Sequence, residues 1–275
     1  MDNNSHGVSR DSRIVPAKWS RSIDVDTVMP DHLPEASLNL RYSSRLVAMY
    51  DERSIGAEKF RVLASRLQYL RKQRSLKKIV VTSTIKGEGK SVISANLAVT
   101  LGQRDKTLFI DGDLRQSGLA DIFGGTDRPG LADWWRDTAG ISSFLLRVEK
   151  LKLWHLPAGQ AVSQPLEILQ SQRTAEMLSQ IAELFEWVII DAPPLVPVAD
   201  PNLWATHADG TLLVVKEGKT PKRLLRKALE GIENLKLIGT VINGSQDVVN
   251  QYYGQYYKGA PNHIRTVPAP KGSPR

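Results

Sequence analysis

The chain has 275 residues, of which 41% are hydrophobic and 24% charged, and this composition can bury a sizeable core. It contains no cysteine, which excludes disulfides, thiolate metal sites and cysteine nucleophiles and suits a reducing compartment. The net charge of +8 favours phosphate ligands, nucleic acid or an anionic membrane surface and does not choose among them.

Residues 1–45 show no sustained hydrophobic period and include three prolines, so we expect a flexible N-terminal tail. Residues 51–74 predict a helix, because Phe60, Leu63, Leu67 and Leu70 form one apolar stripe. The end of this helix is strongly basic. We interpret it as a solvated C-terminus that complements the helix dipole, and contact with acidic lipid or an acidic partner is the alternative.

From residue 78 onward, short apolar runs alternate with helical segments. The predicted strands are 79–83, 107–110, 152–156, 187–190, 211–215 and 237–242. The predicted helices between them are 91–103, 174–185 and 221–233. Apolar strands separated by helices indicate an α/β domain over residues 46–245, with a mostly parallel central sheet covered by helices on both faces. Residues 246–275 return to the composition of a flexible tail.

Residues 79–91 read IVVTSTIKGEGKS, a strand followed by a glycine-rich turn and the start of a helix. This context is typical of a phosphate-binding loop of the P-loop NTPase kind. Gly87 and Gly89 let the backbone approach phosphate oxygens, Lys90 can reach the β- and γ-phosphates of ATP, and Ser91 can bind Mg²⁺. Thr84 stands where the loop pattern has its first glycine.

Two other predicted strands end in aspartates. Asp111 and Asp113 follow the strand at 107–110 in the segment DGDLR, and Asp191 follows the strand at 187–190 in the segment DAPP. Ligands of open parallel sheets bind beyond the carboxyl ends of the strands. Three carboxylates at that edge can hold Mg²⁺ directly or through water, whereas a single aspartate after a strand is usually a turn or helix cap.

Together, the phosphate loop, FIDGDLR and VIIDAPP resemble the bacterial tyrosine kinases (BY-kinases) of capsular and exopolysaccharide synthesis. The resemblance covers about residues 48–258. These kinases are P-loop NTPases related to the deviant Walker A ATPases of plasmid partition and septum placement. In those ATPases a signature lysine lies at the position of Ile85, whereas this chain has its lysine one residue later, at Lys86.

The resemblance implies a function for each motif residue. The catalytic group would be Lys90, Asp111, Asp113 and Asp191, with Asp111 or Asp113 orienting or deprotonating a tyrosine hydroxyl. ATP would contact Gly87, Glu88, Gly89, Lys90, Ser91, Val92 and Asn243. The Mg²⁺ ligands would be Ser91, Asp111 and Asp191, with Asp191 acting through water. Asn243 matches a position that contacts adenine, and a turn residue in Asn-Gly-Ser explains it equally well.

Four tyrosines lie close together near the C-terminus, in the segment QYYGQYYKG. They are Tyr252, Tyr253, Tyr256 and Tyr257. Their polar, glycine-containing surroundings suit a flexible substrate segment, and the cluster matches the one that BY-kinases phosphorylate on neighbouring subunits. A sticky aromatic patch for a partner or an amphipathic strand are the alternatives.

BY-kinases carry E-x-x-R-x-x-R on the helix that builds a ring of subunits. This chain has Glu58 and Arg61 but Ala64 in place of the second arginine, so a homo-oligomer is expected with an incomplete ring motif. Asp200 is a candidate interface or helix-cap residue. We expect a soluble cytoplasmic protein at the inner face of the membrane, held there by a separate chain-length-determinant activator and opposed by a protein-tyrosine phosphatase. No specific nucleic-acid partner is expected.

The predicted function is therefore an ATP-dependent protein tyrosine autokinase that regulates polysaccharide polymerisation or export. Two alternatives remain from the sequence. One is a partition-type switch ATPase, which the basic surface and Lys86 suggest. The other is an interaction module that binds ATP with little turnover, which Thr84 and the incomplete ring motif suggest.

Overall fold

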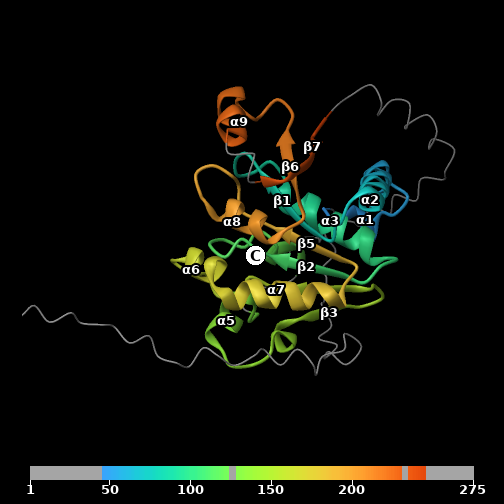
Figure 1. Ribbon diagram of the computed structural model, residues 1–275. Coiled ribbons are helices and arrows are strands. Elements are labelled where there is room, and N and C mark those ends of the chain that lie inside the picture. The colour runs from blue at the N-terminus through green and yellow to red at the C-terminus, as the bar shows by residue number, and fades with distance from the viewer. Residues whose placement is uncertain (1–44, 124–127, 231–234, 246–275) are drawn as a thin grey trace, which may run out of the picture.

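The computed structural model describes residues 45–123, 128–230 and 235–245 (Figure 1). The predicted N-terminal tail, except for residue 45, lies outside the described residues. So does the predicted C-terminal tail of residues 246–275 with its four tyrosines. The described residues form an α/β fold around one seven-stranded sheet.

The sheet has the strand order β3-β4-β2-β5-β1-β6-β7. Its strands are β1 (Lys78–Ser83), β2 (Thr107–Asp111), β3 (Leu146–Val148), β4 (Leu153–Leu156), β5 (Trp187–Asp191), β6 (Gly210–Lys216) and β7 (Leu237–Asn243). Every neighbouring pair is parallel except β3 and β4. The predicted, mostly parallel sheet is confirmed, and all six predicted strands are present. The sequence analysis missed β3, which is too short at three residues to show a period.

Helices cover both faces of the sheet, as predicted (Figure 1). One face carries α1 (Val47–Tyr50), α2 (Ile55–Gln73), α3 (Lys90–Gly102) and α4 (Ala120–Phe123). The other carries α5 (Leu131–Arg136), η2 (Ile141–Phe144), α6 (Pro165–Gln170), α7 (Gln172–Leu184) and α8 (Asp200–His207). The last helix, α9 (Lys222–Leu229), has one buried side chain. No helix within the described ranges is long and apolar enough to cross a membrane.

The predicted helix at 51–74 begins at Ile55, because the hydroxyl of Ser54 accepts a hydrogen bond from the amide of Ala57 and caps the helix. At its basic end, Arg71 pairs with Glu186 at 2.8 Å and lies over the ring of Trp187. That arginine is therefore engaged within the chain, whereas Lys72 and Arg74 are exposed.

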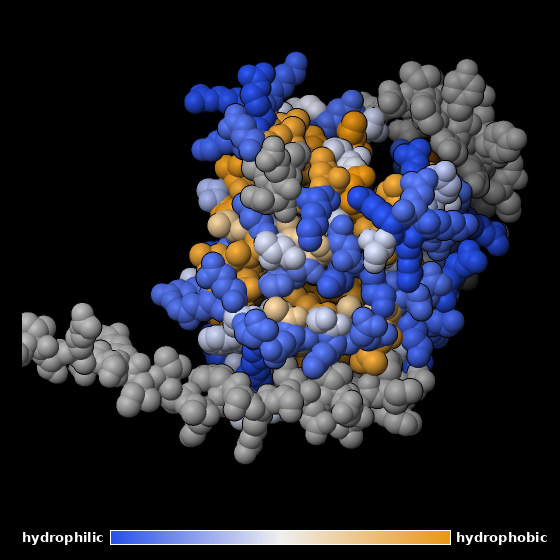
Figure 2. Space-filling model, viewed as in Figure 1, coloured by the Kyte–Doolittle hydropathy of each residue, from blue (hydrophilic) through white to orange (hydrophobic). Residues whose placement is uncertain are grey.

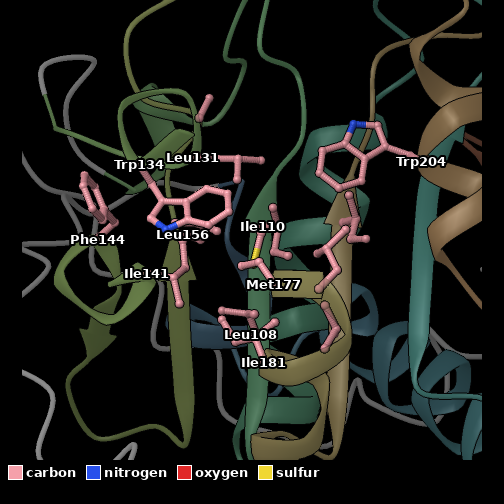
Figure 3. Close-up of a cluster of buried hydrophobic side chains, with 14 of the residues drawn as sticks. Leu108, Ile110, Leu131, Trp134, Ile141, Phe144, Leu156, Met177, Ile181 and Trp204 are labelled. Carbon is pink, nitrogen blue, oxygen red and sulfur yellow. The ribbon is translucent and has the colours of Figure 1, made fainter. Parts of the chain in front are cut away.

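Alternate residues of the buried strands feed two hydrophobic clusters, one on each face, because successive side chains of a strand point to opposite sides. On β2, Leu108 and Ile110 join the cluster under α5 to α8, and Phe109 joins the cluster under α1 to α4. Figure 3 shows the first cluster, in which Met177 and Ile181 of α7 lie close to the side chains of β2. Burial on both faces fixes the central strands rigidly.

The strand register brings the acidic strand ends together. Asp191 lies opposite Val81 of β1 and opposite Asp111 of β2. The carboxyl ends of β1, β2 and β5 therefore meet at one edge of the sheet, where ligands of such sheets bind.

One buried histidine makes folding stability depend on pH. His155 of β4 is 4% exposed, stacks against Phe123 with 4.7 Å between ring centroids, and has its Nδ1 3.2 Å from the carbonyl of Phe109. Burial lowers the pKa of His155 from 6.5 to about 4, so the folded protein keeps this ring neutral.

We predict that His155→Phe flattens the pH dependence of the free energy of unfolding. As the pH falls through 6.5, the unfolded chain takes up a proton that the folded chain refuses until about pH 4. The wild type should lose stability over this interval by up to about 1.4 kcal/mol per pH unit more than the variant. Urea unfolding across the interval measures the difference, and parallel curves for the two proteins would contradict the prediction.

Candidate active site

The loop of residues 84–89 joins β1 to α3 and has the backbone that a phosphate-binding turn needs. Gly87 and Gly89 have φ angles of 86° and 94°, in the left-handed region that favours glycine. A Cβ atom on Gly89 would also collide with the side-chain amide of Asn243. Thr84, where the pattern has glycine, needs no positive φ, so threonine is tolerated there without backbone strain.

Lys90, the first residue of α3, lies between two carboxylates. Its Nζ is 3.3 Å from Oδ2 of Asp191, 3.4 Å from Oδ2 of Asp113 and 3.2 Å from the hydroxyl of Ser91. Burial by itself would lower the pKa of Lys90, but the charges of Asp191, Asp113 and Asp111 outweigh it and raise that pKa. The ammonium group therefore stays charged.

Asp111 and Asp191 are both buried at the ends of adjacent strands. Burial, and then the charge of Asp191, raise the pKa of Asp111 to about 7, against the opposing hydrogen bonds from the Ser117 hydroxyl and the Asp113 amide. Burial also raises the pKa of Asp191, although Lys90 and hydrogen bonds such as that from Ser94 at 3.0 Å oppose it. The charge of Asp191 thus opposes ionisation of the neighbouring Asp111, while Asp191 itself is paired with Lys90.

The donor set fits Mg·ATP. The first backbone N–H groups of α3 have no acceptor within the helix, so those of Lys90, Ser91 and Val92 can bind phosphate oxygens. In the part of the chain that the structure describes, no group of three or more His, Asp or Glu side chains could hold a metal by itself. The predicted ligands Ser91, Asp111 and Asp191 supply only two carboxylates, and a magnesium site completed by phosphate and water needs no more.

Glu88 lies inside the phosphate loop, and its side chain turns away from the phosphate position. The buried carboxylate accepts hydrogen bonds from the amide of Ile85 at 2.9 Å, from the amide of Lys216 at 3.4 Å and from the hydroxyl of Thr220. What Glu88 can offer to ATP is its backbone N–H. Asn243 at the end of β7 donates to the carbonyl of Glu88 at 2.8 Å, so this predicted adenine contact also fastens the loop.

The sequence analysis missed three partners of the motif residues. The hydroxyl of Ser94 donates to Asp191, and that of Ser117 donates to Asp111. Serines near a motif are too common in sequences for such bonds to be predicted from them. The third is the pair of Arg115 with Asp200, in which Nε to Oδ2 is 2.8 Å and Nη2 to Oδ1 is 3.1 Å. Asp200 is 1% exposed. This ion pair joins the loop after β2, which carries Arg115, to the first turn of α8, which carries Asp200.

Two departures from the expected motifs have structural explanations. Lys86 donates to Oε1 of Gln116 at 2.7 Å, so it bonds within its own chain. On α2, Glu58 and Arg61 form a surface pair at 2.7 Å, and Ala64 is 6% exposed in the core under α2. An arginine at position 64 would have to place its charge in that core.

No protein-family model matches the chain. It is 31% identical over 229 residues to "Tyrosine-protein kinase YwqD" of Bacillus subtilis, covering 78% of this chain and 92% of that protein. It is 34% identical over 198 residues to "Succinoglycan biosynthesis transport protein ExoP" of Rhizobium meliloti, covering 65% of this chain and 25% of that protein.

Among solved structures, the chimerical protein CapA2B2 superposes with a TM-score of 0.71 and 29% identity, covering 80% of this chain and 98% of that one. The cell division ATPase MinD of Pyrococcus furiosus shares the fold with a TM-score of 0.52 and 24% identity, covering 62% of this chain and 74% of that one. The phosphate loop, the paired aspartates and the likeness to the curated tyrosine-protein kinases agree, and the chain belongs to the bacterial tyrosine kinase family within the P-loop NTPases.

Proposed function

We propose that this protein is an ATP-dependent tyrosine autokinase that phosphorylates the tyrosine cluster of its C-terminal tail in trans. Through this modification it regulates the polymerisation or export of an exopolysaccharide or capsule. The observation that carries the proposal is the position of Lys90, whose ammonium group lies 3.3 and 3.4 Å from carboxylates on two different strand ends. This is a phosphate-binding cation beside candidate bases and metal ligands.

Each group has a distinct task in the proposed reaction. Lys90 and the backbone N–H groups at the start of α3 hold the phosphates of the substrate ATP, and Mg²⁺ supplies charge neutralisation when bound. A tyrosine oxygen bonds to the γ-phosphorus while the bond from that phosphorus to the bridging oxygen breaks and leaves ADP. Asp111 or Asp113 accepts the proton of the hydroxyl. Alignment and charge neutralisation supply most of the catalysis in such transfers.

The proposed partners follow from the family. A relative named as a biosynthesis transport protein is several times longer than the part it shares with this chain, and a solved relative is a chimerical protein. We infer that a membrane activator on another chain holds this protein at the inner face of the membrane. A phosphatase opposes it, and copies of the chain associate although Ala64 leaves the ring motif incomplete.

Arg115, the arginine of the DGDLR segment, is expected to hold in place the loop after β2, which carries the proposed base. Arg115→Ala leaves the carboxylate of Asp200, 1% exposed, without its cation and should cost roughly 1–3 kcal/mol of folding stability. Asp200→Asn should cost less, because the side chain of Arg115 is 38% exposed and water can solvate it. Chemical unfolding of both variants tests this asymmetry, which equal or reversed losses would refute.

Replacement of the loop lysine should abolish autophosphorylation. We expect Lys90→Met to lower phosphotyrosine formation at residues 252–257 by roughly 10²–10³-fold with Mg·ATP, because a preorganised cation is lost. Peptide mass spectrometry measures it, with Lys72→Met on the exposed end of α2 as the matched lysine control. Phosphate retained in Lys90→Met would contradict the proposal. ATP-dependent dimers without phosphotyrosine, even with activator present, would support the switch ATPase instead.

A mixing experiment tests transfer in trans. One chain carries Lys90→Met and an intact tail, and the other is active and carries phenylalanine at Tyr252, Tyr253, Tyr256 and Tyr257. We expect phosphotyrosine on the inactive chain, at a rate that rises with the concentration of the active one. Transfer in cis would give two different results. The wild-type chain would phosphorylate itself at a rate independent of dilution, and the inactive chain in the mixture would carry no phosphotyrosine.

A further inference from the structure

The segment around α9 is strongly basic and begins beside the phosphate loop. Residues 216–230 contain six cationic and two acidic side chains. Four of the cations, Lys222, Arg223, Arg226 and Lys227, are exposed and lie on α9 itself. Because a helix turns by about 100° per residue, these four span an arc of about 140°. We call them the α9 basic face.

The opposite side of α9 packs inward. Leu224 and Leu225 are half-buried and Ala228 is buried. In the described part of the chain no ion pair involves any member of the α9 basic face. In Figure 2 hydrophilic side chains stand out from the molecule at the top of the view, where Figure 1 places α9. The four charges are thus presented to solvent.

The segment that leads into α9 lies close both to the phosphate loop and to the place where the C-terminal tail begins. Thr220, just before α9, bonds Glu88, and the ammonium group of Lys219 is 3.4 Å from where a Cβ on Gly87 would be. Asn243 at the end of β7 also bonds Glu88, and its carbonyl accepts from the amide of Glu217 at 2.9 Å. The tail therefore leaves the domain next to the segment that leads into α9.

We propose that the α9 basic face binds the phosphorylated tyrosine cluster of the same chain's tail. The proposal rests on the proposed autokinase function and adds a regulatory step to it: the product tail is held beside its own phosphate loop and withdrawn from the site of the neighbouring copy. Tyr252 is seven residues beyond Ser245, a reach of up to about 25 Å. Tyr257 is twelve residues beyond, a reach of up to about 43 Å.

The charge of the tail changes sign on phosphorylation. Residues 246–275 carry four Lys and Arg and one Asp, so their side chains sum to +3 and are repelled by the α9 basic face. Four phosphates would add about −6 to −8. The modified tail then becomes an anionic partner, with acceptor oxygens suited to arginine and lysine. Only the phosphorylated form is complementary.

The tail can also span the whole α9 basic face. The pairs at 222 and 223 and at 226 and 227 are about 6 Å apart along the helix axis. Tyr252 and Tyr253 are four residues before Tyr256 and Tyr257, a separation that the chain can extend to about 14 Å. Both tyrosine pairs can therefore reach cations of the same face.

The test is a binding titration that needs no kinase activity. Synthetic peptides of residues 246–258, with four phosphotyrosines or with none, are titrated by fluorescence anisotropy into the phosphatase-treated full chain. We expect binding of the phosphopeptide only, weakened by added salt. Replacing all four members of the α9 basic face by glutamine should weaken it about tenfold, since each exposed contact contributes modestly.

The matched control replaces four exposed cations near and on α2 by glutamine, which removes the same charge. They are Arg53, Arg66, Lys72 and Arg74. This control should bind the phosphopeptide within about twofold of the wild type, as expected for long-range charge that salt screens. If both variants lost phosphopeptide affinity equally, the net charge of the protein alone would explain the binding. That result would overturn the proposal.

Three further results would also overturn it. Equal binding of both peptides would show that phosphate is not recognised. Displacement of the phosphopeptide by ADP, with full binding to the α9 variant, would place it in the nucleotide site. The α9 variant could lose binding to phosphatidylglycerol vesicles and still bind the phosphopeptide. The α9 basic face would then be a membrane contact. If the wild-type chain had no kinase activity, the proposed function would be wrong. The titration would still be interpretable, because its phosphopeptide is synthetic.

Discussion

The site depends on one ion pair, that between Lys90 and Asp191. Asp191 ends β5 between β1 and β2 and is 0% exposed, and a buried carboxylate is costly unless a cation or several donors compensate it. Lys90 compensates it from the first residue of α3, at 3.3 Å. The requirement fixes where α3 begins, and thereby where its free backbone N–H groups point.

The same rule organises the loops around that pair. The buried Asp200 pairs with Arg115 of the loop after β2. The buried Glu88 accepts hydrogen bonds from Lys216 at the end of β6 and from Thr220 beyond it. Three buried carboxylates thus join the loops at one edge of the sheet into a connected set. A phosphoryl transfer requires alignment above all, and these bonds hold the loops in defined positions.

The strands, the long helices and the motif residues could be predicted, because apolar runs, turn glycines and acidic strand ends are local signals. The partners of the buried carboxylates could not. Glu88 bonds Lys216, 128 residues away, and Asp200 bonds an arginine 85 residues away. The burial of Ala64, by contrast, agrees with the local pattern, because this position lies four residues after Phe60 and three before Leu67 on the apolar stripe of the helix. Pairings at such separation are decided by the strand order, which the sequence pattern leaves open.

Burial separates two kinds of charged group in this molecule. At the carboxyl ends of β2 and β5 the charges are few and buried, and their surroundings raise the pKa of Lys90 and that of Asp111. On α9 the charges are many and exposed, and the helix buries a single side chain. Exposed cations contribute little to folding stability, but their attraction to a partner changes with the charge of that partner. The segment from Lys216 to Thr220 connects the two kinds of group, because it bonds Glu88 of the phosphate loop and leads directly into α9.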